Sequence, residues 1–447
     1  MEINKRKFYR QVFALVIPMA LQNLINVGVT AADVLMLGRV SEKVLSGASL
    51  AGQIQFVMTL ILFGTTSGAT VLTAQYWGKK DTQTIEKILG MGMTIGVSCA
   101  ALFTIVAEII PEVLLHIYTS DPAVIAEGVK YLRIVALSYV LMAATQVYLY
   151  IMRSIEQVVI ATVVYSASLI CNVLVNALLI FGLFGLPKMG IMGAAIGTLV
   201  ARILELVIVV IYIIKDKKIE LFKQKLLQSD DSLRKDYMKA AMPIILAQIL
   251  WGVSVPMQTA ILGHLSDDAI AANSVATTFY QYLKVIVIAM TSASAVMMGN
   301  GVGRGNMKRI RSDARTLATI DVAVGIVLGI ILFALKNPLL SMYQLSGEAL
   351  RLADHLIVIM SFVMVGMSYQ MPVSAGIIQG GGDTKFNMVM SMISTWAIVM
   401  PLSFAAAFWW KLPVELVVIV IQSDQFFKGI PAFIRFRSYR WVKKLTN

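Results

Sequence analysis

The stretch from Pro18 to Gly38, PMALQNLINVGVTAADVLMLG, is mostly apolar and is uncharged except for Asp33. The nearest other charged residues are Arg10 before it and Arg39 after it. About 20 apolar residues suffice for a helix to cross the hydrocarbon core of a bilayer. A charged side chain on such a helix costs about 3 kcal/mol on insertion scales, so it normally faces a protein interior or a water-filled cavity. The stretch therefore predicts a membrane-spanning helix with a functional carboxylate near its end.

The composition of the whole chain indicates a membrane protein. Of its 447 residues, 58% are hydrophobic and 14% are charged, whereas soluble chains have about 25% charged residues. The basic start MEINKRKFYR precedes an apolar stretch that is too long for a signal peptide, so we expect no cleaved leader. Cys99 and Cys171 both fall inside apolar segments, which predicts no disulfide framework.

Twelve apolar segments are long enough to span the membrane, and they do not alternate as barrel strands do. In the first half the predicted spans are Gln11–Leu37, Leu45–Ala74, Leu89–Ile110, Val129–Met152, Val158–Leu183 and Ile191–Ile214. In the second half they are Met242–Leu262, Ala271–Met298, Leu317–Leu335, Leu356–Ile378, Phe386–Trp410 and Val414–Ile434. We therefore predict an all-α integral membrane protein with twelve transmembrane helices.

The placement of Lys and Arg predicts the orientation. An even number of spans puts both termini on one side, and most basic residues fall in the loops and tails of that side, for example YWGKKDTQTIEK and FIRFRSYRWVKK. By the positive-inside rule this side is the cytoplasm. The net charge of +13 is thus explained by orientation and by contact with anionic membrane lipid, and we expect no nucleic-acid partner.

The two halves of the chain resemble each other. When residues 18–78 are shifted by 225 positions, they align with the second half without a gap. Pro18 then matches Pro243, Gly38 matches Gly263 and Gly78 matches Gly303. We predict an N-terminal six-helix lobe at 1–214, a cytoplasmic linker at 215–239 and a C-terminal six-helix lobe at 240–447, related by an internal repeat. Paired halves are typical of secondary transporters. The segment QGGGDTK at 379–385 follows no strand and lacks the lysine spacing of a phosphate-binding loop, so we expect no ATP hydrolysis.

Asp33 has two interpretations, an interfacial acid or an ion-exchange site. The apolar run continues from Val34 to Leu37 and Asp is too short to reach far, which favours the exchange site. Burial disfavours a charged carboxylate, while a bound cation or a positive substrate favours it. One such group can exchange a proton or a metal ion for a cationic compound. The two ligands then exclude each other, which is the minimum requirement for antiport.

Asn172 and Asn176 lie four residues apart in CNVLVNALL and so share one helix face. Two amide oxygens beside a carboxylate suit a small hard cation such as Na⁺. The alternative is that the two amides only hydrogen-bond neighbouring helices. Thr198, in the next span, is a weaker candidate ligand. We therefore predict an ion-coupling site of Asp33, Asn172, Asn176 and Thr198, a candidate Na⁺ site at the first three, and H⁺ or Na⁺ as coupling ion without other cofactors.

Other charged residues lie within the predicted spans. Two spacings permit ion pairs on one helix, Arg202 with Glu205 and Asp424 with Lys428, and we expect mutual neutralisation. Lys284 has no acid nearby in sequence and either pairs with Asp424 or reaches toward a cavity. With the repeat partner of Asp33, which is Gln258, these residues form a candidate polar network of the second lobe: Gln258, Lys284, Asp424 and Lys428.

Two acids, Glu108 and Asp321, lie near predicted span ends, where we expect an interfacial position.

The chain also resembles a known family. A proline early in the first span, an aspartate 15 residues later, then MLGRVS, QYWGKKD and QGGGDTK resemble, in this order, the multidrug and toxic compound extrusion (MATE) family and its bacterial NorM/DinF-like members. The resemblance implies a drug/cation antiporter whose two lobes form a V and open alternately to each side. It implies that Asp33 couples the cation and that bending at Pro18, as a hinge, accompanies ion binding and substrate release.

The sequence departs from some branches of this family. Those branches carry an acid in span seven and another in span ten, but PIILAQILWGVSVPMQTAILG and VGMSYQMPVSAGI contain none. We therefore expect coupling in the first lobe. The 26 methionines and the aromatic residues suit a cavity for organic cations or amphipathic drugs. A monomer suffices for this mechanism, and the plasma (inner) membrane is the expected location.

Two other classes of membrane protein fit the sequence less well. A flippase for a lipid-linked saccharide, from the wider superfamily, commonly has more spans and a cationic cavity, whereas these spans hold three basic residues. An integral-membrane enzyme would need clustered ligands, but His116, His264 and His355 lie far apart in sequence. We therefore predict a transporter and not an enzyme.

Overall fold

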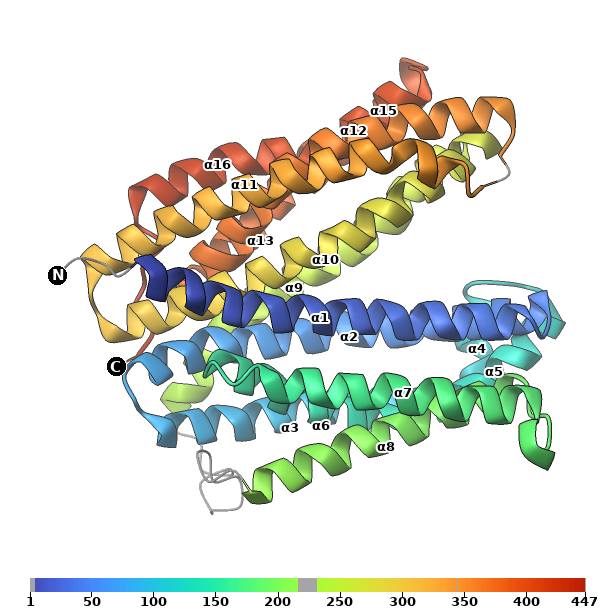
Figure 1. The fold of residues 1–447 in the computed structure, drawn as a ribbon, viewed down its shortest axis with the longest axis horizontal. Helices are drawn as coiled ribbons and strands as arrows, with labels where there is room; N and C mark the ends of the chain where they lie inside the picture. The colour runs from blue at the N-terminus through green and yellow to red at the C-terminus, as the bar shows by residue number, and fades with distance from the viewer. Residues whose placement is uncertain (1–4, 216–230, 344, 447) are drawn as a thin grey trace. The chain divides into compact units, whose positions relative to one another are not determined.

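The computed structural model describes residues 5–215, 231–343 and 345–446, and across these ranges every regular element is a helix (Figure 1). Eleven of the described helices are long and apolar enough to cross a membrane, and one bent pair brings the number to twelve. The predicted all-α membrane fold is therefore confirmed. The predicted linker at 215–239 falls mostly on residues 216–230, which lie outside the described ranges.

The described residues up to Lys215 form eight α-helices and one short 3₁₀ turn. These are α1 (Lys5–Gly38), α2 (Glu42–Gly78), α3 (Thr82–Ile109), α4 (Pro111–His116), α5 (Pro122–Ala136), α6 (Ser138–Ser154), α7 (Val159–Phe181), η1 (Leu183–Gly185) and α8 (Ile191–Lys215). Most helices extend beyond the predicted spans, because the apolar run marks only the part in hydrocarbon while backbone hydrogen bonds continue into the polar ends.

The predicted fourth span, Val129–Met152, is wrong as a single helix. It belongs to α5 and α6, which meet at Leu137 with a bend of 48°. The Ser138 hydroxyl donates a 2.6 Å hydrogen bond to the carbonyl of Val135, and such side-chain bonds compete with the helical backbone ladder. The apolar pattern runs through this bend without a change.

The second half contains π-helical segments as well as α-helices. Its elements are α9 (Asp231–Gly263), α10 (Asp267–Arg304), α11 (Met307–Leu340), α12 (Gly347–Met371), η3 (Pro372–Ile378), α13 (Thr384–Ser391), η4 (Met392–Val399), α14 (Met400–Phe404), η5 (Ala405–Trp409), α15 (Val414–Gln422) and α16 (Asp424–Ser438). The π segments η3, η4 and η5 widen the helices of predicted spans ten and eleven, and such segments occur often at functional sites.

Contacts divide the chain into two compact units. The N-terminal unit comprises Leu21–Thr73 and Lys80–Ala241. The C-terminal unit comprises the chain up to Ala20, the end of α2 at Ala74–Lys79, and everything from Met242. This division departs from the predicted linear lobes at the start of α1 and at the end of α2, both of which group with the C-terminal unit.

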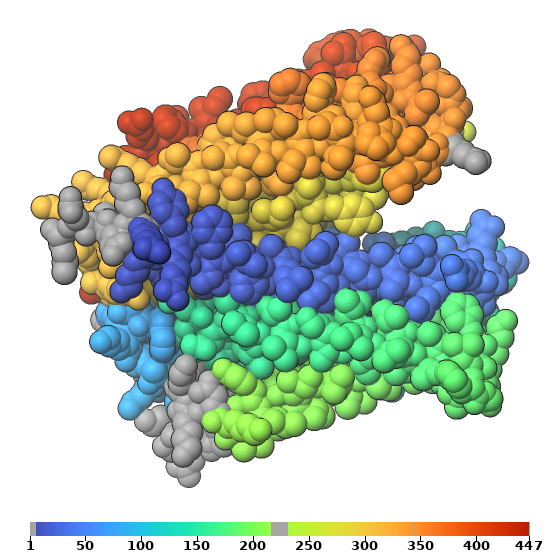
Figure 2. Space-filling view, viewed as in Figure 1, coloured from blue at the N-terminus to red at the C-terminus, as the bar shows by residue number. Residues whose placement is uncertain are grey.

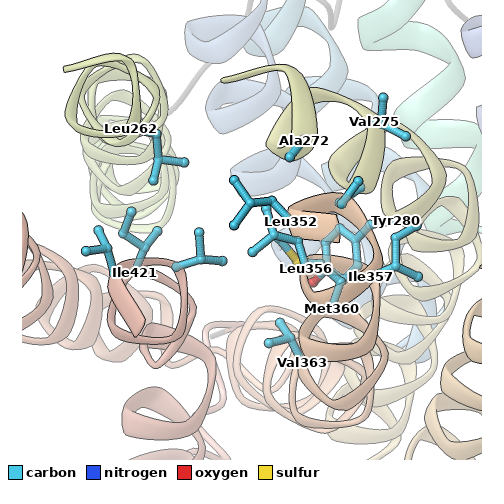
Figure 3. Packing of buried hydrophobic residues seen from close by; sticks show 14 of the residues in the cluster. Leu262, Ala272, Val275, Tyr280, Leu352, Leu356, Ile357, Met360, Val363 and Ile421 are labelled. Atoms are coloured by element: carbon cyan, nitrogen blue, oxygen red, sulfur yellow. The ribbon is translucent and has the colours of Figure 1, made fainter. Parts of the chain in front are cut away.

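The core of the C-terminal unit is built around α12. Leu356, Ile357 and Met360 on this helix have no exposed surface. Figure 3 shows them beside residues of α10 such as Ala272 and Tyr280. A helix that is apolar on nearly all sides belongs in the interior of a bundle. In the N-terminal unit the buried cluster lies instead among α2, α3, α5 and α6.

The last described residues fold back onto the C-terminal unit. Trp441 has no exposed surface, stacks parallel to Phe436 with 6.5 Å between ring centroids, and donates a 3.1 Å hydrogen bond from Nε1 to the carbonyl of Phe436. Its indole lies against Gly381, where any Cβ would collide with the ring. The glycine of the QGGGDTK turn therefore makes room for Trp441.

Both polar motifs that stood out in the sequence contact this segment. The buried Asp383 carboxylate of QGGGDTK binds the Lys443 ammonium at 2.8 Å and the Arg435 guanidinium. Gln75 of QYWGKKD donates from Nε2 to the carbonyl of Lys443 at 3.1 Å and accepts the backbone N–H of Leu445 at 2.8 Å. In this structure both motifs therefore hold the segment after α16.

We predict that Trp441→Ala lowers thermal stability. Truncation of a buried aromatic side chain typically costs about 3–5 kcal/mol through lost burial and a cavity. The measurement is the unfolding temperature of the purified protein in detergent. Trp410→Ala is the control, because Trp410 is 57% exposed. An equal shift for both variants would contradict the docking of this segment.

Candidate ion-coupling site

Three of the four predicted coupling residues meet in the N-terminal unit. The Asn176 side chain donates from Nδ2 to the Asp33 carboxylate at 2.6 Å and to the Asn172 amide oxygen at 3.2 Å. Both asparagines are buried on one face of α7, while Asp33 on α1 is half-buried. The space-filling view shows α1, α7 and α8 as neighbouring bands (Figure 2). The shared helix face predicted for the two asparagines is confirmed; their role remains a prediction.

The orientation of the Asn176 amide decides what the site offers to a cation. Its Nδ2 group faces Asp33 and Asn172, and its buried Oδ1 has no hydrogen-bond partner in the described structure. A half-turn of the amide exchanges the two atoms. The same side chain can therefore present a donor to a bare carboxylate, or an oxygen to a protonated carboxyl or a metal ion. For Na⁺, the ligand oxygens at hand are those of Asp33, Asn172 and the rotated Asn176.

Glycines of α8 bring this helix against the asparagine face of α7. A Cβ at Gly197 would overlap the Asn176 Oδ1 atom, and a Cβ at Gly193 would lie within 3 Å of the backbone of Leu179 and Ile180. The sequence analysis did not identify Gly193 and Gly197. Their signal is the GAAIG spacing at 193–197, a small-residue pattern that lets membrane helices approach closely.

A second layer of polar residues surrounds Asp33. Arg202 on α8 forms a two-bonded ion pair with Glu205, at 2.8 and 3.0 Å, as their spacing predicts. Electrostatic interactions connect Asp33 with Arg202 and with Tyr131 of α5. Thr198 adjoins Tyr131, and no direct bond from Thr198 to Asp33 is among the described contacts. The sequence reading did not identify Tyr131, because nothing in the chain pattern places α5 near α1.

The formal charges of this group leave one negative charge to neutralise. Asp33 and Glu205 contribute two negative charges and Arg202 one positive charge, which gives a net charge of −1. Glu205 is 1% exposed and fully engaged with Arg202. Asp33 therefore carries the uncompensated negative charge of this group.

Gln22 fixes α1 to α7 and was also missed. It has no exposed surface, and its Nε2 donates to the carbonyl of Val158 at 2.9 Å and to the hydroxyl of Thr162 at 2.8 Å. This anchor lies one turn after Pro18 in a helix that remains continuous through the proline.

The candidate network of the C-terminal unit is only partly assembled. The Asp424 carboxylate binds Lys428 at 2.6 Å and accepts hydrogen bonds from Ser394 and Thr395 at 2.8 and 3.0 Å. Lys284 is not paired with Asp424; its ammonium lies 5.4 Å from the centre of the Trp251 ring. In the described structure Gln258 makes no hydrogen bond to the other three residues. The arrangement is an Asp424–Lys428 pair and a separate lysine.

The two acids near predicted span ends differ in their burial. Asp321 has no exposed surface inside the C-terminal unit, whereas Glu108 is partly exposed near the end of α3. Their expected position at the membrane interface stays a prediction. Span position alone does not reveal how many neighbouring helices cover a residue. Across the described ranges, no three His, Cys, Asp or Glu side chains come together in a way that could hold a metal ion.

The sequence model of the MatE family matches residues 18–178 and, a second time, residues 243–405. The chain belongs to the MATE family. The two matches begin at Pro18 and Pro243, which confirms the internal repeat. Related curated proteins include a probable multidrug resistance protein NorM of Thermotoga maritima, 21% identical and covering 97% of this chain and 93% of the relative. Another is a probable multidrug resistance protein NorM of Agrobacterium fabrum, which is 25% identical and covers 90% of this chain and 87% of the relative.

Solved MATE structures share the fold. The Vibrio cholerae MATE transporter VcmN in its bent form matches with a TM-score of 0.87 at 19% identity, covering 97% of each chain. A MATE crystal structure described as the straight conformation matches with a TM-score of 0.87 at 15% identity, covering 96% of this chain and 95% of that one. This MATE chain is thus a multi-pass membrane protein of a transporter family.

We predict that Gly197→Ala disrupts the Asp33 cluster. The added methyl group occupies the position of the Asn176 amide oxygen, so α7 and α8 separate or Asn176 turns away from Asp33. Overpacking of this kind costs about 1–3 kcal/mol. The measurement is binding of an organic cation to the purified protein, together with its unfolding temperature.

The matched control for this variant is Gly52→Ala on α2. An added Cβ there meets no atom within 4 Å. We expect this change to be neutral or mildly stabilising, because Ala favours helices over Gly. Unchanged binding in Gly197→Ala would show that the Asn176 position is not needed.

Proposed function

We propose that this MATE protein is a secondary antiporter that exports cationic or amphipathic organic compounds in exchange for H⁺ or Na⁺, with Asp33 as the exchange site. The observation that carries the proposal is the Asp33–Asn176–Asn172 cluster, whose single uncompensated negative charge lies on a membrane-spanning helix. The related NorM proteins are named as probable multidrug resistance proteins, which supports drugs as the substrate class.

The exchange follows from charge. A bare Asp33 carboxylate is stabilised by the Asn176 donor and attracts a cation. When a proton or Na⁺ binds there, the cluster becomes neutral and no longer attracts a positive substrate. A cationic compound that reaches the carboxylate displaces the ion for the same reason. Occupation by either ligand excludes the other, and this exclusion couples substrate export to the inward flow of the ion.

Paired cations in the spans support a drug exporter over a transporter of anionic lipid-linked saccharides. Arg202 is neutralised by Glu205 and Lys428 by Asp424, while Lys284 lies over an indole. The basic loops support a plasma (inner) membrane location with both termini in the cytoplasm. We take the monomer as the working unit.

Pro18 is the proposed hinge of α1. It has no backbone N–H for the carbonyl of Ala14, so the helix lacks one hydrogen bond there. The helix packs with the C-terminal unit up to Ala20 and with the N-terminal unit from Leu21. Gln22 holds the second part on α7. A bend at Pro18 therefore leaves the segment that carries Asp33 fixed to the asparagines.

The first prediction from this proposal is that Asp33→Asn abolishes efflux. The amide keeps the shape of the side chain but cannot neutralise a cation. The measurement is efflux of a fluorescent organic cation from preloaded proteoliposomes, with a proton gradient and a Na⁺ gradient imposed separately. The gradient that drives efflux in the wild type identifies the coupling ion.

Glu42→Gln serves as the control, because Glu42 is an exposed acid at the start of α2 in the same unit. It should transport as the wild type does. Wild-type efflux by Asp33→Asn would refute the exchange site.

The second prediction is that Pro18→Ala slows transport but retains substrate binding. Alanine restores the helical hydrogen bond and resists bending. Turnover in proteoliposomes and equilibrium binding in detergent are measured side by side. Pro256→Ala on α9 is the control for removing a proline from a long helix. If Pro18→Ala turns over at the wild-type rate, α1 does not bend at this residue.

A further inference from the structure

Asp321 is a buried acid that the proposed exchange at Asp33 leaves unexplained. It has no exposed surface, and neither carboxyl oxygen has a hydrogen-bond partner in the described residues. It lies almost four turns inside α11, which begins at Met307. An unpaired charge at such a position costs several kcal/mol, because burial removes its hydration without replacement. The carboxyl must therefore be neutralised by a ligand.

The face of α11 that bears Asp321 packs against α12. One turn along from Asp321, Gly325 touches the side chain of Ser368, and one turn further Gly329 touches the backbone of Ser361. The two helices thus run antiparallel, as Figure 1 also shows. The next turn, with Asp321, faces the region where α12 passes into η3, and α11 and η3 are in contact.

Ser368 on this face has two oxygen atoms, one in its hydroxyl and one in its carbonyl, that lack their usual hydrogen-bond partners. Its hydroxyl oxygen is buried and has no hydrogen-bond partner in the described structure. Its carbonyl lacks the usual helical donor, because the residue four positions later is Pro372, which has no N–H. The π-helical segment η3 begins at this proline. Asp321 and Ser368 are thus two buried polar side chains of this interface without hydrogen-bond partners in the described residues.

No hydrogen bond or ion pair to Asp321 is present among the described residues. On α10 and α11, Lys284 lies over Trp251, Arg309 pairs with Asp313, Arg311 and Arg315 contact Tyr439, and Lys336 pairs with Asp354 of α12, while Arg304 and Lys308 lie at the helix ends. The basic start of α1, with Lys7 and Arg10, also packs beside α11, where Phe8 and Tyr9 share a pocket with Ile320. The remaining charged residues of α12, Glu348, Arg351 and His355, lie in its first half, and η3 has none.

The ligand that fits is a proton. A hard metal cation needs several ligands, and across the described ranges Asp321 belongs to no group of three His, Cys, Asp or Glu side chains that could hold one. We propose that Asp321 is a proton-binding site of the C-terminal unit, separate from Asp33. Protonation itself does not depend on the proposed antiport; only its use in transport does.

The direct test is labelling of the wild-type protein with dicyclohexylcarbodiimide. This apolar reagent adds to a protonated carboxyl in a dry environment, and the adduct is located by mass spectrometry of peptides from α11. Asp321 should be labelled at neutral pH, and labelling should fall as the solution is made alkaline. Asp313 is the internal control on the same helix, because it is ion-paired with Arg309 at 3.4 Å. It should stay unlabelled.

The infrared absorption of protonated carboxyl groups gives a second readout. A band present in the wild type should vanish in Asp321→Asn and persist in Asp313→Asn.

Absence of both the label and the band at neutral pH would overturn the proposal, because Asp321 would then be ionised. These readouts are independent of transport. If Asp321 is protonated while Asp33→Asn exports normally, the proton site stands and the exchange role of Asp33 falls. If Asp33→Asn fails to export and Asp321 is unlabelled, the exchange role of Asp33 stands and the proton site at Asp321 falls.

Discussion

A polar side chain on a lipid-spanning helix must find its partner inside the protein, and this constraint governs both units. Most charged residues meet it with a neighbour: Arg202 with Glu205, and Asp424 with Lys428 and two hydroxyl groups. Asp33 meets it only in part, because Asn176 gives it a hydrogen bond but no positive charge. Since an amide cannot neutralise a carboxylate, the negative charge of Asp33 stays uncompensated, and the proposed exchange rests on this charge.

That site depends on packing that carries no charge at all. Asn176 reaches Asp33 because α8 lies close to α7, and α8 lies close because positions 193 and 197 are glycines. The same glycine leaves room for the Asn176 oxygen on the side away from Asp33. Rotation of this amide is therefore the smallest motion by which the cluster can answer a change of ligand, and it needs no movement of a helix.

The sequence predicts the features that depend on local pattern. Apolar length indicates the spans, and a spacing of four places Asn172 and Asn176 on one face. Features that depend on neighbours in space are not predictable in this way. The bend at Leu137 lies within an unbroken apolar run. Tyr131 and Gln22 connect helices that lie side by side in the structure, but no sequence motif indicates that these helices are neighbours. The full burial of Asp321 is likewise not predictable, because position along a helix does not report how many helices surround a residue.

The repeat duplicates the fold but not the chemistry. Gln258 stands where the first half has Asp33, so the corresponding helix of the C-terminal unit offers an amide in place of an acid. The uncompensated carboxyl of that unit is instead Asp321, on α11 and beside the π-helical start of η3. Asp33 is half-buried and can meet a solute, whereas Asp321 is enclosed and can accept little more than a proton. In the proposed scheme the two related units respond to different ligands and give a transporter two distinct inputs, which a symmetric pair of sites could not provide.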